Sequence, residues 1–262
     1  MLESKQHSEN LWITLTYDNQ HLPTNCESSR LSRFFGSSEF PTLWRPDYQN
    51  FFKRLREYNV PPFKYFIAGE YGEKFHRPHY HACLFGLGDA HRSAIKRAWA
   101  VRDSNNALAP IGNIYFGSLT WDSMQYTCSY TVKKMTSFKH EELHGRYPEF
   151  GQASKGLALL AVSDIVSYMR RYRLNNVPSV LVIGGRTVPV PRYIKIKLRQ
   201  ELGISDAEAK KDWEEEMYHM RLRLKNSTEH FSLEELYADE NRQSLINQDA
   251  KLKLFYQKEN LL

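Results

Sequence analysis

The chain has 262 residues, of which 41% are hydrophobic, 13% aromatic and 25% charged, and this composition excludes disordered, collagen-like and low-complexity proteins. Its net charge of +6 is uneven, because residues 205–262 hold 9 Lys and Arg against 13 Asp and Glu, which leaves +10 on residues 1–204. A basic body of this size favours a polyanionic partner such as nucleic acid, although many soluble proteins reach it without one. No apolar run approaches the roughly 18 residues of a membrane span, and residues 1–15 lack the features of an export signal.

The three cysteines, Cys26, Cys83 and Cys128, are far apart in the sequence and form no CxxC pair. This usage argues against a disulfide framework and against a cysteine-rich zinc site. We therefore expect the protein to reside in a reducing cytoplasm.

The N-terminal half reads as strands that alternate with helices and loops. Period-two patterns predict strands and 3.6-residue patterns predict helices. In chain order we expect a strand over 11–17, a loop over 18–45, a helix over 46–58, strands over 63–70 and 79–85, a helix over 89–101 and a strand over 114–119.

The second half is more helical. After Thr120, a helix cap, we expect a helix to residue 135, a loop over 136–156, a helix over 163–174, a hairpin of 180–183 with 187–190, and a charged helix after Gly203. The mixture predicts an α+β fold, a central antiparallel sheet with helices packed on one face and a helical C-terminal extension. The expected domains are residues 1–204 and 205–262. A doubly wound parallel sheet is disfavoured because no glycine-rich phosphate loop follows a strand.

A histidine pair in the predicted strand 79–85 carries the clearest chemical signal. Residues two apart in a strand point to the same face, so His79 and His81 project side by side and can ligate one divalent ion. Glu70 ends the preceding predicted strand, across the turn from His79, and is the candidate third ligand; Glu73, in the turn, is a weaker one. Two imidazoles and a carboxylate leave open positions, a set that suits Mn²⁺ or Mg²⁺. Ordinary half-exposed strand histidines are the competing interpretation.

A tyrosine pair marks the predicted helix after Thr120. At 100° per residue, an apolar stripe that includes Trp121, Met124 and Cys128 forms a core-facing side, and Tyr126, Tyr130 and Lys133 lie on the opposite side. Packing against another element is the competing interpretation for these tyrosines. A phenol, with a pKa near 10, becomes a useful nucleophile only when its proton is removed or its anion is stabilised, and an adjacent ammonium and a bound metal ion would supply that.

Taken in order, GEYGEKFHRPHYHACLFG and QYTCSYTVKK resemble the HUH-endonuclease initiators of rolling-circle replication, above all those of gokushovirus-type microviruses. ITLTY near the start is similar to the family's first motif, and the likeness covers about residues 10–200. It implies an HUH/Rep-like, ferredoxin-like sheet, metal ligands at His79, His81 and Glu70, and catalytic roles for Tyr126, Tyr130 and Lys133. We expect Arg77 and Lys134, which adjoin these motifs, to contact DNA.

The resemblance implies a site-specific single-stranded DNA nickase and ligase that uses Mn²⁺ or Mg²⁺ and attaches covalently to the 5′ end. It also implies origin DNA as partner and the host bacterial cytoplasm as location. Ser129 departs from the pattern, because many relatives carry a basic residue there. Lys133 follows Tyr130 by three and no lysine follows Tyr126 at that spacing, so Tyr130 is the favoured nucleophile and Tyr126 the candidate for a second cleavage.

Two other functions stay open at this point. One keeps the chemistry in a plasmid relaxase or transposase, although relaxases usually place their tyrosines near the N-terminus and small transposases usually have one. The other is a basic nucleic-acid-binding protein without catalysis. The acidic extension is either a solvated helix or a site that recruits a host helicase. The origin sequence, the order of the tyrosines, the physiological metal and the oligomeric state are not encoded in any pattern that we recognise.

Overall fold

The computed structural model describes residues 1–24, 40–72, 74–135, 146–174 and 176–227, together with residues 242 and 246. The chain divides into two units, one of Met1–Ile165 with Val182–Thr187 and the other of Val166–Leu181 with Val188–Leu262. Each unit is described by itself below. The domain boundary expected after residue 204 stays a prediction.

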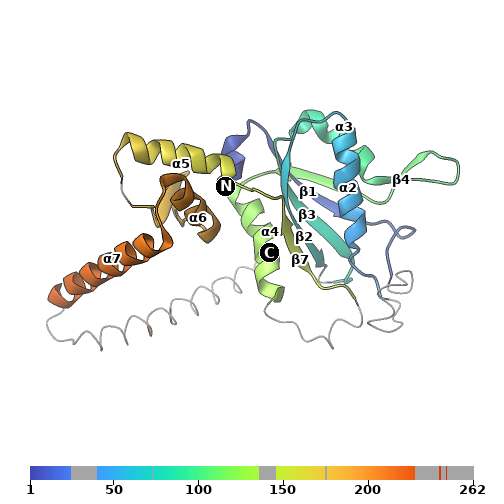
Figure 1. The fold of residues 1–262 in the computed structure, drawn as a ribbon. Helices are drawn as coiled ribbons and strands as arrows, with labels where there is room; N and C mark the ends of the chain where they lie inside the picture. Colours follow the sequence, from blue (N-terminus) through green and yellow to red (C-terminus); the bar gives the residue numbers. More distant parts are fainter. Residues whose placement is uncertain are drawn as a thin grey trace. The chain divides into compact units, whose positions relative to one another are not determined.

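An antiparallel sheet forms the centre of the first unit (Figure 1). Every neighbouring pair in it is antiparallel, which confirms the predicted α+β class. The strand order is β6-β1-β3-β2-β7, where β1 is Asn10–Thr16, β2 Lys64–Tyr71, β3 Pro78–Phe85, β6 Ile114–Ser118 and β7 Phe150–Ala153.

The helices of this unit cover both faces of the sheet, so the expectation that they share one face was wrong. Helix α2 (Arg45–Glu57) and helix α3 (Arg92–Ala98) bury their apolar sides in the main core, against the alternate residues of β1 that include Ile13 and Leu15. Helix α4 (Trp121–Met135) packs on the other face, where Met124 joins Cys83 and Phe85 of β3 in a smaller cluster. The second helix layer forms because β3 has apolar side chains on both of its faces.

Several short elements were not predicted. Strand β7 lies inside the expected loop 136–156, and its pairing with β2 requires a close approach, because a Cβ on Gly69 would lie 2.7 Å from the Phe150 ring. The other unpredicted elements are η1 (Glu3–Gln6), η2 (Asp89–His91) and the hairpin of β4 (Ala100–Arg102) with β5 (Leu108–Pro110). Such segments gain their structure from pairing and packing, since each is too short to show a clear period.

The N-terminal turn is fixed to the first unit by Glu3. This side chain is buried, and its carboxylate accepts hydrogen bonds from the Ala158 amide and from Lys64 Nζ at 3.3 Å. His7 Nε2 lies 2.7 Å from the other carboxylate oxygen. Three distant parts of the chain therefore meet at one carboxylate.

The second unit is mainly helical. Its helices include α6 (Arg192–Leu202), which was not predicted, and α7 (Asp206–Ser227), which confirms the expected helix after Gly203. Gly203 has φ 70°, a left-handed conformation that ends α6. Helix α5 (Leu159–Arg171) and the predicted hairpin of β8 (Val180–Ile183) with β9 (Arg186–Pro189) have residues in both units. None of the helices in the described part of the chain combines the length and apolar character that a membrane span requires. The expected helix beyond Ser227 lies almost wholly outside the described residues.

Candidate metal centre

The three predicted ligands come together at one end of the central sheet. Glu70, near the end of β2, pairs directly with His79 at the start of β3, and His81 follows two residues later. Strand alternation places all three side chains on the face that α4 covers. Glu70 is 3% exposed and His81 is 4% exposed, so the cluster lies largely below the protein surface.

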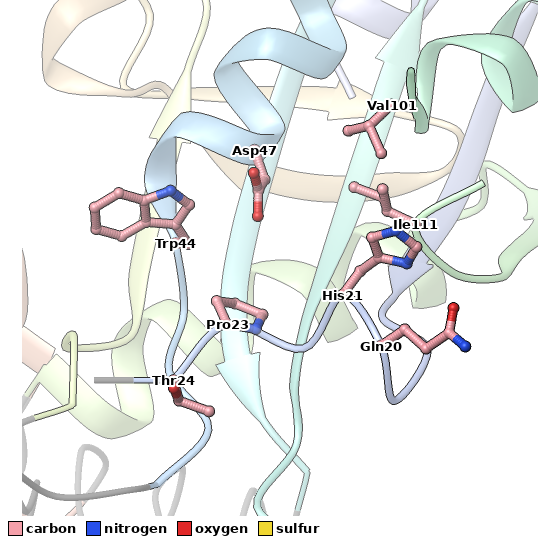
Figure 2. Close-up of a pocket in the computed structure, with 8 residues that line it drawn as sticks. All are labelled: Gln20, His21, Pro23, Thr24, Trp44, Asp47, Val101 and Ile111. Atoms are coloured by element: carbon pink, nitrogen blue, oxygen red, sulfur yellow. The ribbon is translucent and has the colours of Figure 1, made fainter. Parts of the chain in front are cut away.

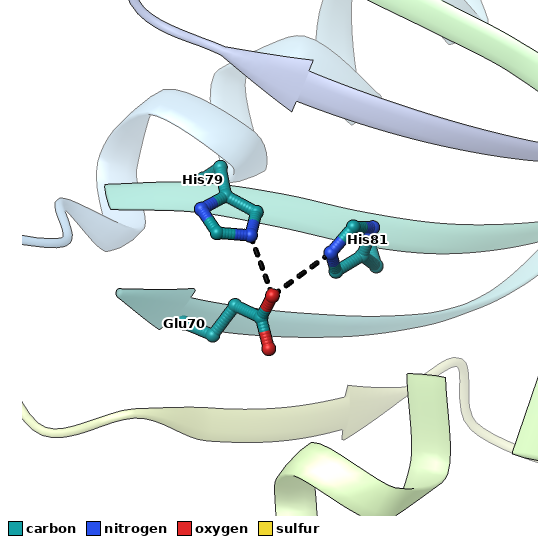
Figure 3. Close-up of side chains that lie close together, drawn as sticks. All are labelled: Glu70, His79 and His81. Atoms are coloured by element: carbon teal, nitrogen blue, oxygen red, sulfur yellow. Dashed lines mark hydrogen bonds and ion pairs between the residues drawn. The ribbon is translucent and has the colours of Figure 1, made fainter. Parts of the chain in front are cut away.

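Both imidazoles point at the same carboxylate oxygen (Figure 3). Glu70 Oε1 lies 2.5 Å from His79 Nε2 and 2.9 Å from His81 Nε2. One potential ligand atom from each of the three residues lies within 4.8 Å of the other two. This convergence confirms that Glu70, His79 and His81 form a group that could bind a metal ion.

The opposite ring nitrogens are held by other groups. His79 Nδ1 lies 3.2 Å from the Arg77 carbonyl oxygen, and His81 Nδ1 lies 2.9 Å from Thr14 Oγ1 on β1. Partners of this kind fix the ring orientation of metal-binding histidines and leave the other nitrogen for the ion. The His81 ring also stacks on Trp12, with ring centroids 5.2 Å apart and planes 9° apart.

The charges of the cluster depend on these contacts. Burial alone would raise the pKa of Glu70, but the hydrogen bonds from His79 and His81 lower it below its ordinary value. For His79, burial is outweighed by the Glu70 carboxylate and the pKa is raised, since both ring nitrogens face acceptors. Burial dominates for His81 and lowers its pKa. Without a metal ion, the cluster therefore holds a carboxylate beside one imidazolium and one neutral imidazole.

A divalent cation fits this donor set. Glu70 Oε2 is buried and has no hydrogen-bond partner among the described residues, an arrangement that buried carboxylate oxygens rarely show. Two Nε2 atoms and a carboxylate together supply the nitrogen and oxygen ligands that divalent ions take. The choice between Mn²⁺ and Mg²⁺ stays a prediction.

Tyr126 lies next to this cluster. Its ring centroid is 5.2 Å from that of His81 and 6.1 Å from that of Trp12, and the side chain is 38% exposed. Helix α4 thus brings one predicted tyrosine against a predicted metal ligand. The backbone of α4 continues through Tyr130, Lys133 and Lys134, but the side chains of these three predicted residues lie outside the described residues.

Arg77, the other predicted DNA contact, is described in full. Its guanidinium group donates to the Tyr17 carbonyl oxygen at 3.0 Å and to Asn19 Oδ1 at 2.8 Å. These bonds join the start of β3 to the loop that follows β1. Arg77 therefore has a structural role beside the cluster, and its contact with DNA stays a prediction.

Helix α4 is rotated relative to the sequence-based expectation. Met124 is buried as expected, but Cys128 is exposed and Thr127 is fully buried in its place. The Thr127 hydroxyl accepts a hydrogen bond from Trp12 Nε1 at 2.9 Å and donates one to the Ser123 carbonyl oxygen at 2.8 Å. Because both bonds satisfy the hydroxyl, a polar residue can occupy this core-facing position.

Three residues that support the site were missed by sequence reasoning. Trp12 and Thr14 contact His81, and Thr127 holds Trp12. A signal was present in part, because Trp12 and Thr14 alternate with the buried residues of β1 and so share one face. Their contact with His81 additionally requires β1 to pair with β3, which no local pattern specifies.

A separate cavity of about 390 Å³ lies beside the first turn of α2 (Figure 2). Asp47 points into it, and Asp47 Oδ2 accepts a hydrogen bond from the Tyr17 hydroxyl at 2.7 Å. Burial raises the pKa of Asp47. The lining residues are Gln20, His21, Pro23, Thr24, Trp44, Asp47, Val101 and Ile111. None of the three candidate ligands lines this cavity, so it is not the metal centre.

Comparisons with known proteins agree with this geometry. Residues 10–135, which span β1 to α4 and include the cluster, match the family model of replication-associated protein ORF2. Replication-associated protein VP4 of Bdellovibrio phage phiMH2K is 29% identical over 207 residues, covering 73% of this chain and 58% of that protein. Replication-associated protein ORF2 of Spiroplasma virus 4 is 27% identical over 226 residues, covering 83% of this chain and 63% of that protein.

A third relative, replication-associated protein ORF4 of Chlamydia phage 1, is 26% identical over 223 residues, or 76% of this chain and 48% of that protein. The chain thus spans about half to three-fifths of the length of these relatives. No solved structure matches the chain. The predicted kinship with microvirus replication proteins is confirmed: the chain is a homologue of the replication-associated proteins of small phages, and it belongs with the replication-associated protein ORF2 family.

Proposed function

We propose that the chain is an HUH-type endonuclease that nicks and rejoins single-stranded DNA at a phage replication origin and so initiates rolling-circle replication. The observation that carries this proposal is the contact between Tyr126 and His81, because it puts a phenol beside a group built to hold a cation. The homology to phage replication-associated proteins supports a role in genome replication. We place its action in the host bacterial cytoplasm, with origin DNA as its partner.

The proposed roles follow from the contacts of each side chain. Glu70, His79 and His81 would hold a divalent ion through Oε1 or Oε2 and the two Nε2 atoms, while Thr14 and the Arg77 carbonyl keep the imidazoles oriented. When bound, a Mn²⁺ or Mg²⁺ ion neutralises negative charge on the phosphate oxygens. The carboxylate and the buried position of the cluster select a cation over an anion at this point.

The proposed bond change is a transfer of one phosphoryl group. A tyrosine Oη attacks the phosphorus, the bond from phosphorus to the 3′ oxygen breaks, the phenol loses its proton and the 3′ oxygen gains one. The products are a 5′-phosphotyrosine and a free 3′ hydroxyl. Because an ester replaces an ester, the reverse reaction rejoins the strand without ATP.

Two tyrosines give the reaction a way to continue. We propose that Tyr130 makes the first cut, with Lys133 stabilising its phenolate, and that Tyr126 makes the second cut on the regenerated origin. Tyr130 follows Tyr126 by four residues, which is one turn of α4. While one tyrosine holds the 5′ end, the other can accept the next strand. Arg77 and Lys134 are proposed to contact the DNA backbone, and the acidic extension is a candidate site for a host helicase.

The decisive experiment is a denaturing-gel assay for a covalent adduct between protein and labelled single-stranded DNA. The full-length protein is incubated with Mn²⁺ or Mg²⁺ and randomised oligonucleotides, and the shifted band is sequenced to find the cleavage site. We expect Tyr130→Phe to remove most of the adduct and the double change with Tyr126→Phe to remove all of it. Tyr115→Phe, which alters an exposed tyrosine of β6, is the matched control and should keep the adduct.

Metal dependence provides the second arm of this assay. His81→Ala should abolish cutting while the circular dichroism spectrum stays that of the folded protein. An undiminished adduct in the Tyr126→Phe/Tyr130→Phe variant would refute the proposed mechanism. Equal DNA binding with and without metal, and no adduct under any condition, would favour the non-catalytic binding protein instead.

A further inference from the structure

The second unit contains an exposed surface where aromatic and cationic side chains alternate. Tyr168 is 58% exposed and Tyr172 55% exposed, and their ring centroids lie 4.5 Å apart on one flank of α5 and the turn that follows it. Arg170, Arg171 and Arg173 are exposed between and beside them. We call these five residues the basic–aromatic surface.

The packing of α5 does not require these tyrosines. Its buried side is supplied by Val166, which is 5% exposed, and Met169, which is fully buried. Residues three apart share a helix face, so this pair already forms an apolar stripe. Two large rings in water, one turn apart, are therefore left over after the helix has packed.

The charge of this part of the unit is strongly positive. Residues 166–181 and 188–204 contain seven Lys and Arg but a single acidic residue, Glu201. Arg170 bonds the Glu201 carbonyl oxygen at 3.3 Å, and Arg171 lies 5.7 Å from the centre of the Tyr172 ring. Within the described part of the chain, no carboxylate pairs with the guanidinium groups of Arg170, Arg171 or Arg173. The surface is thus an uncompensated cationic field around two accessible rings.

We propose that the basic–aromatic surface binds single-stranded DNA, with bases stacked on Tyr168 and Tyr172 and phosphates held by the neighbouring arginines. Aromatic platforms inside a positive field are the usual means of holding a single strand without sequence preference. A duplex hides the faces of its bases from such rings, and an acidic protein would need the arginines but not the tyrosines. Single-stranded DNA is the ligand that uses both features.

This surface is independent of the candidate metal centre in its chemistry. It shares with the proposed function only the class of ligand, and it requires neither a metal ion nor a tyrosine nucleophile. Its role would be to retain a strand that the protein has cut or is about to cut. Binding measured in EDTA, where no cleavage is expected, isolates this role.

The test is fluorescence anisotropy of a labelled oligo-dT with full-length protein in EDTA. Stacking on one ring is worth about 1–3 kcal/mol, so loss of both rings in Tyr168→Ala/Tyr172→Ala should weaken binding by at least about tenfold. Tyr168→Phe/Tyr172→Phe keeps the rings and should bind within about twofold of the unaltered protein. Tyr218→Ala removes an equally exposed tyrosine, 54% accessible, from the acidic helix α7 and is the matched control.

The arginines are tested by the salt dependence of the same binding. Arg171→Ala/Arg173→Ala should reduce the slope of log K against log salt by about 0.7 for each lost phosphate contact. Lys210→Ala, at an exposed cation paired with Glu214, should leave the slope unchanged. Thermal unfolding of each variant establishes that the fold is retained.

Two results would overturn the inference. One is equal oligo-dT binding by the Tyr168→Ala/Tyr172→Ala variant and the unaltered protein. The other is an equal loss of binding in the two phenylalanine changes, which would replace stacking by a role of the hydroxyls. If the adduct assay fails while the alanine variant still loses its binding, only the proposed function is refuted and this inference stands.

Discussion

Thr14 offers the sharpest test of the metal centre, because it touches the site without being a ligand. Its hydroxyl lies 2.9 Å from His81 Nδ1, and His81 is 4% exposed. Thr14→Val keeps the shape and the β-branched side chain but removes the hydroxyl. When His81 ligates through Nε2, its Nδ1–H then has no partner.

The expected loss follows from the cost of a buried unpaired donor, which is about 1–3 kcal/mol. Part of this cost is also present without metal, since the same hydroxyl bonds His81 there, so the metal-dependent part lies near the lower end. Loss of an outer partner of a metal-binding histidine typically weakens metal affinity by about 10–100-fold. We therefore expect the Thr14→Val variant to bind Mn²⁺ about tenfold more weakly, a change of about 1.4 kcal/mol.

Calorimetric titration with Mn²⁺ measures this affinity directly, and thermal unfolding provides a second readout. A ligand at about 100 times its Kd stabilises the fold by about 2.7 kcal/mol, and a tenfold weaker site at the same concentration gives about 1.4 kcal/mol. The metal-dependent rise in Tm should therefore fall by about half. Thr16→Val is the matched control, because Thr16 Oγ1 donates to the Asn113 carbonyl oxygen at 3.0 Å. Equal Mn²⁺ affinity in the Thr14→Val and Thr16→Val variants would refute the assigned role of Thr14.

Three further predictions test the site and its support. Glu70→Gln should abolish the Mn²⁺-dependent rise in Tm, since an amide cannot replace the charge of a buried carboxylate; a preserved rise would show that Glu70 is not a ligand. Thr127→Val leaves Trp12 Nε1–H unpaired and should lower the free energy of unfolding in urea by about 1–3 kcal/mol, more than Thr127→Ser, which keeps the hydroxyl. Burial would raise the pKa of Glu3, but its hydrogen bonds with His7, Ala158 and Lys64 lower it, so its stabilisation is complete above the ordinary pKa near 4.3 and disappears as the pH falls through the lowered value. The unaltered protein should thus lose more stability than Glu3→Gln between about pH 6 and pH 3, and parallel losses would contradict this account.

The ligand set was predictable because it depends on local geometry. His79 and His81 are two apart on one strand, and Glu70 is joined to them by a short turn, so hairpin pairing brings Glu70 opposite His79. Period-two alternation then fixes the face for all three residues. These relations involve neighbours in sequence and need no knowledge of the remaining fold.

The surroundings of the ligands depend on distant segments. Trp12 and Thr14 reach His81 only because β1 inserts beside β3, and Tyr126 reaches it only because α4 packs on the same face. A helical wheel gave the period of α4 but not its rotation, which Thr127 fixes by bonding Trp12. Such contacts are chosen by the total packing of the core, where one buried hydrogen bond can outweigh a modest apolar preference.

The sequence by itself determined the α+β class, the positions of the main strands and helices, the histidine pair with its carboxylate and the uneven charge. Each of these follows from short-range periodicity or from composition. The tertiary structure decided the strand order, the edge strand β7, the two helix-covered faces and the approach of Tyr126 to the candidate metal centre. The physical reason is that local conformational preferences act between residues a few positions apart, whereas pairing and burial join segments that only the complete fold brings into contact.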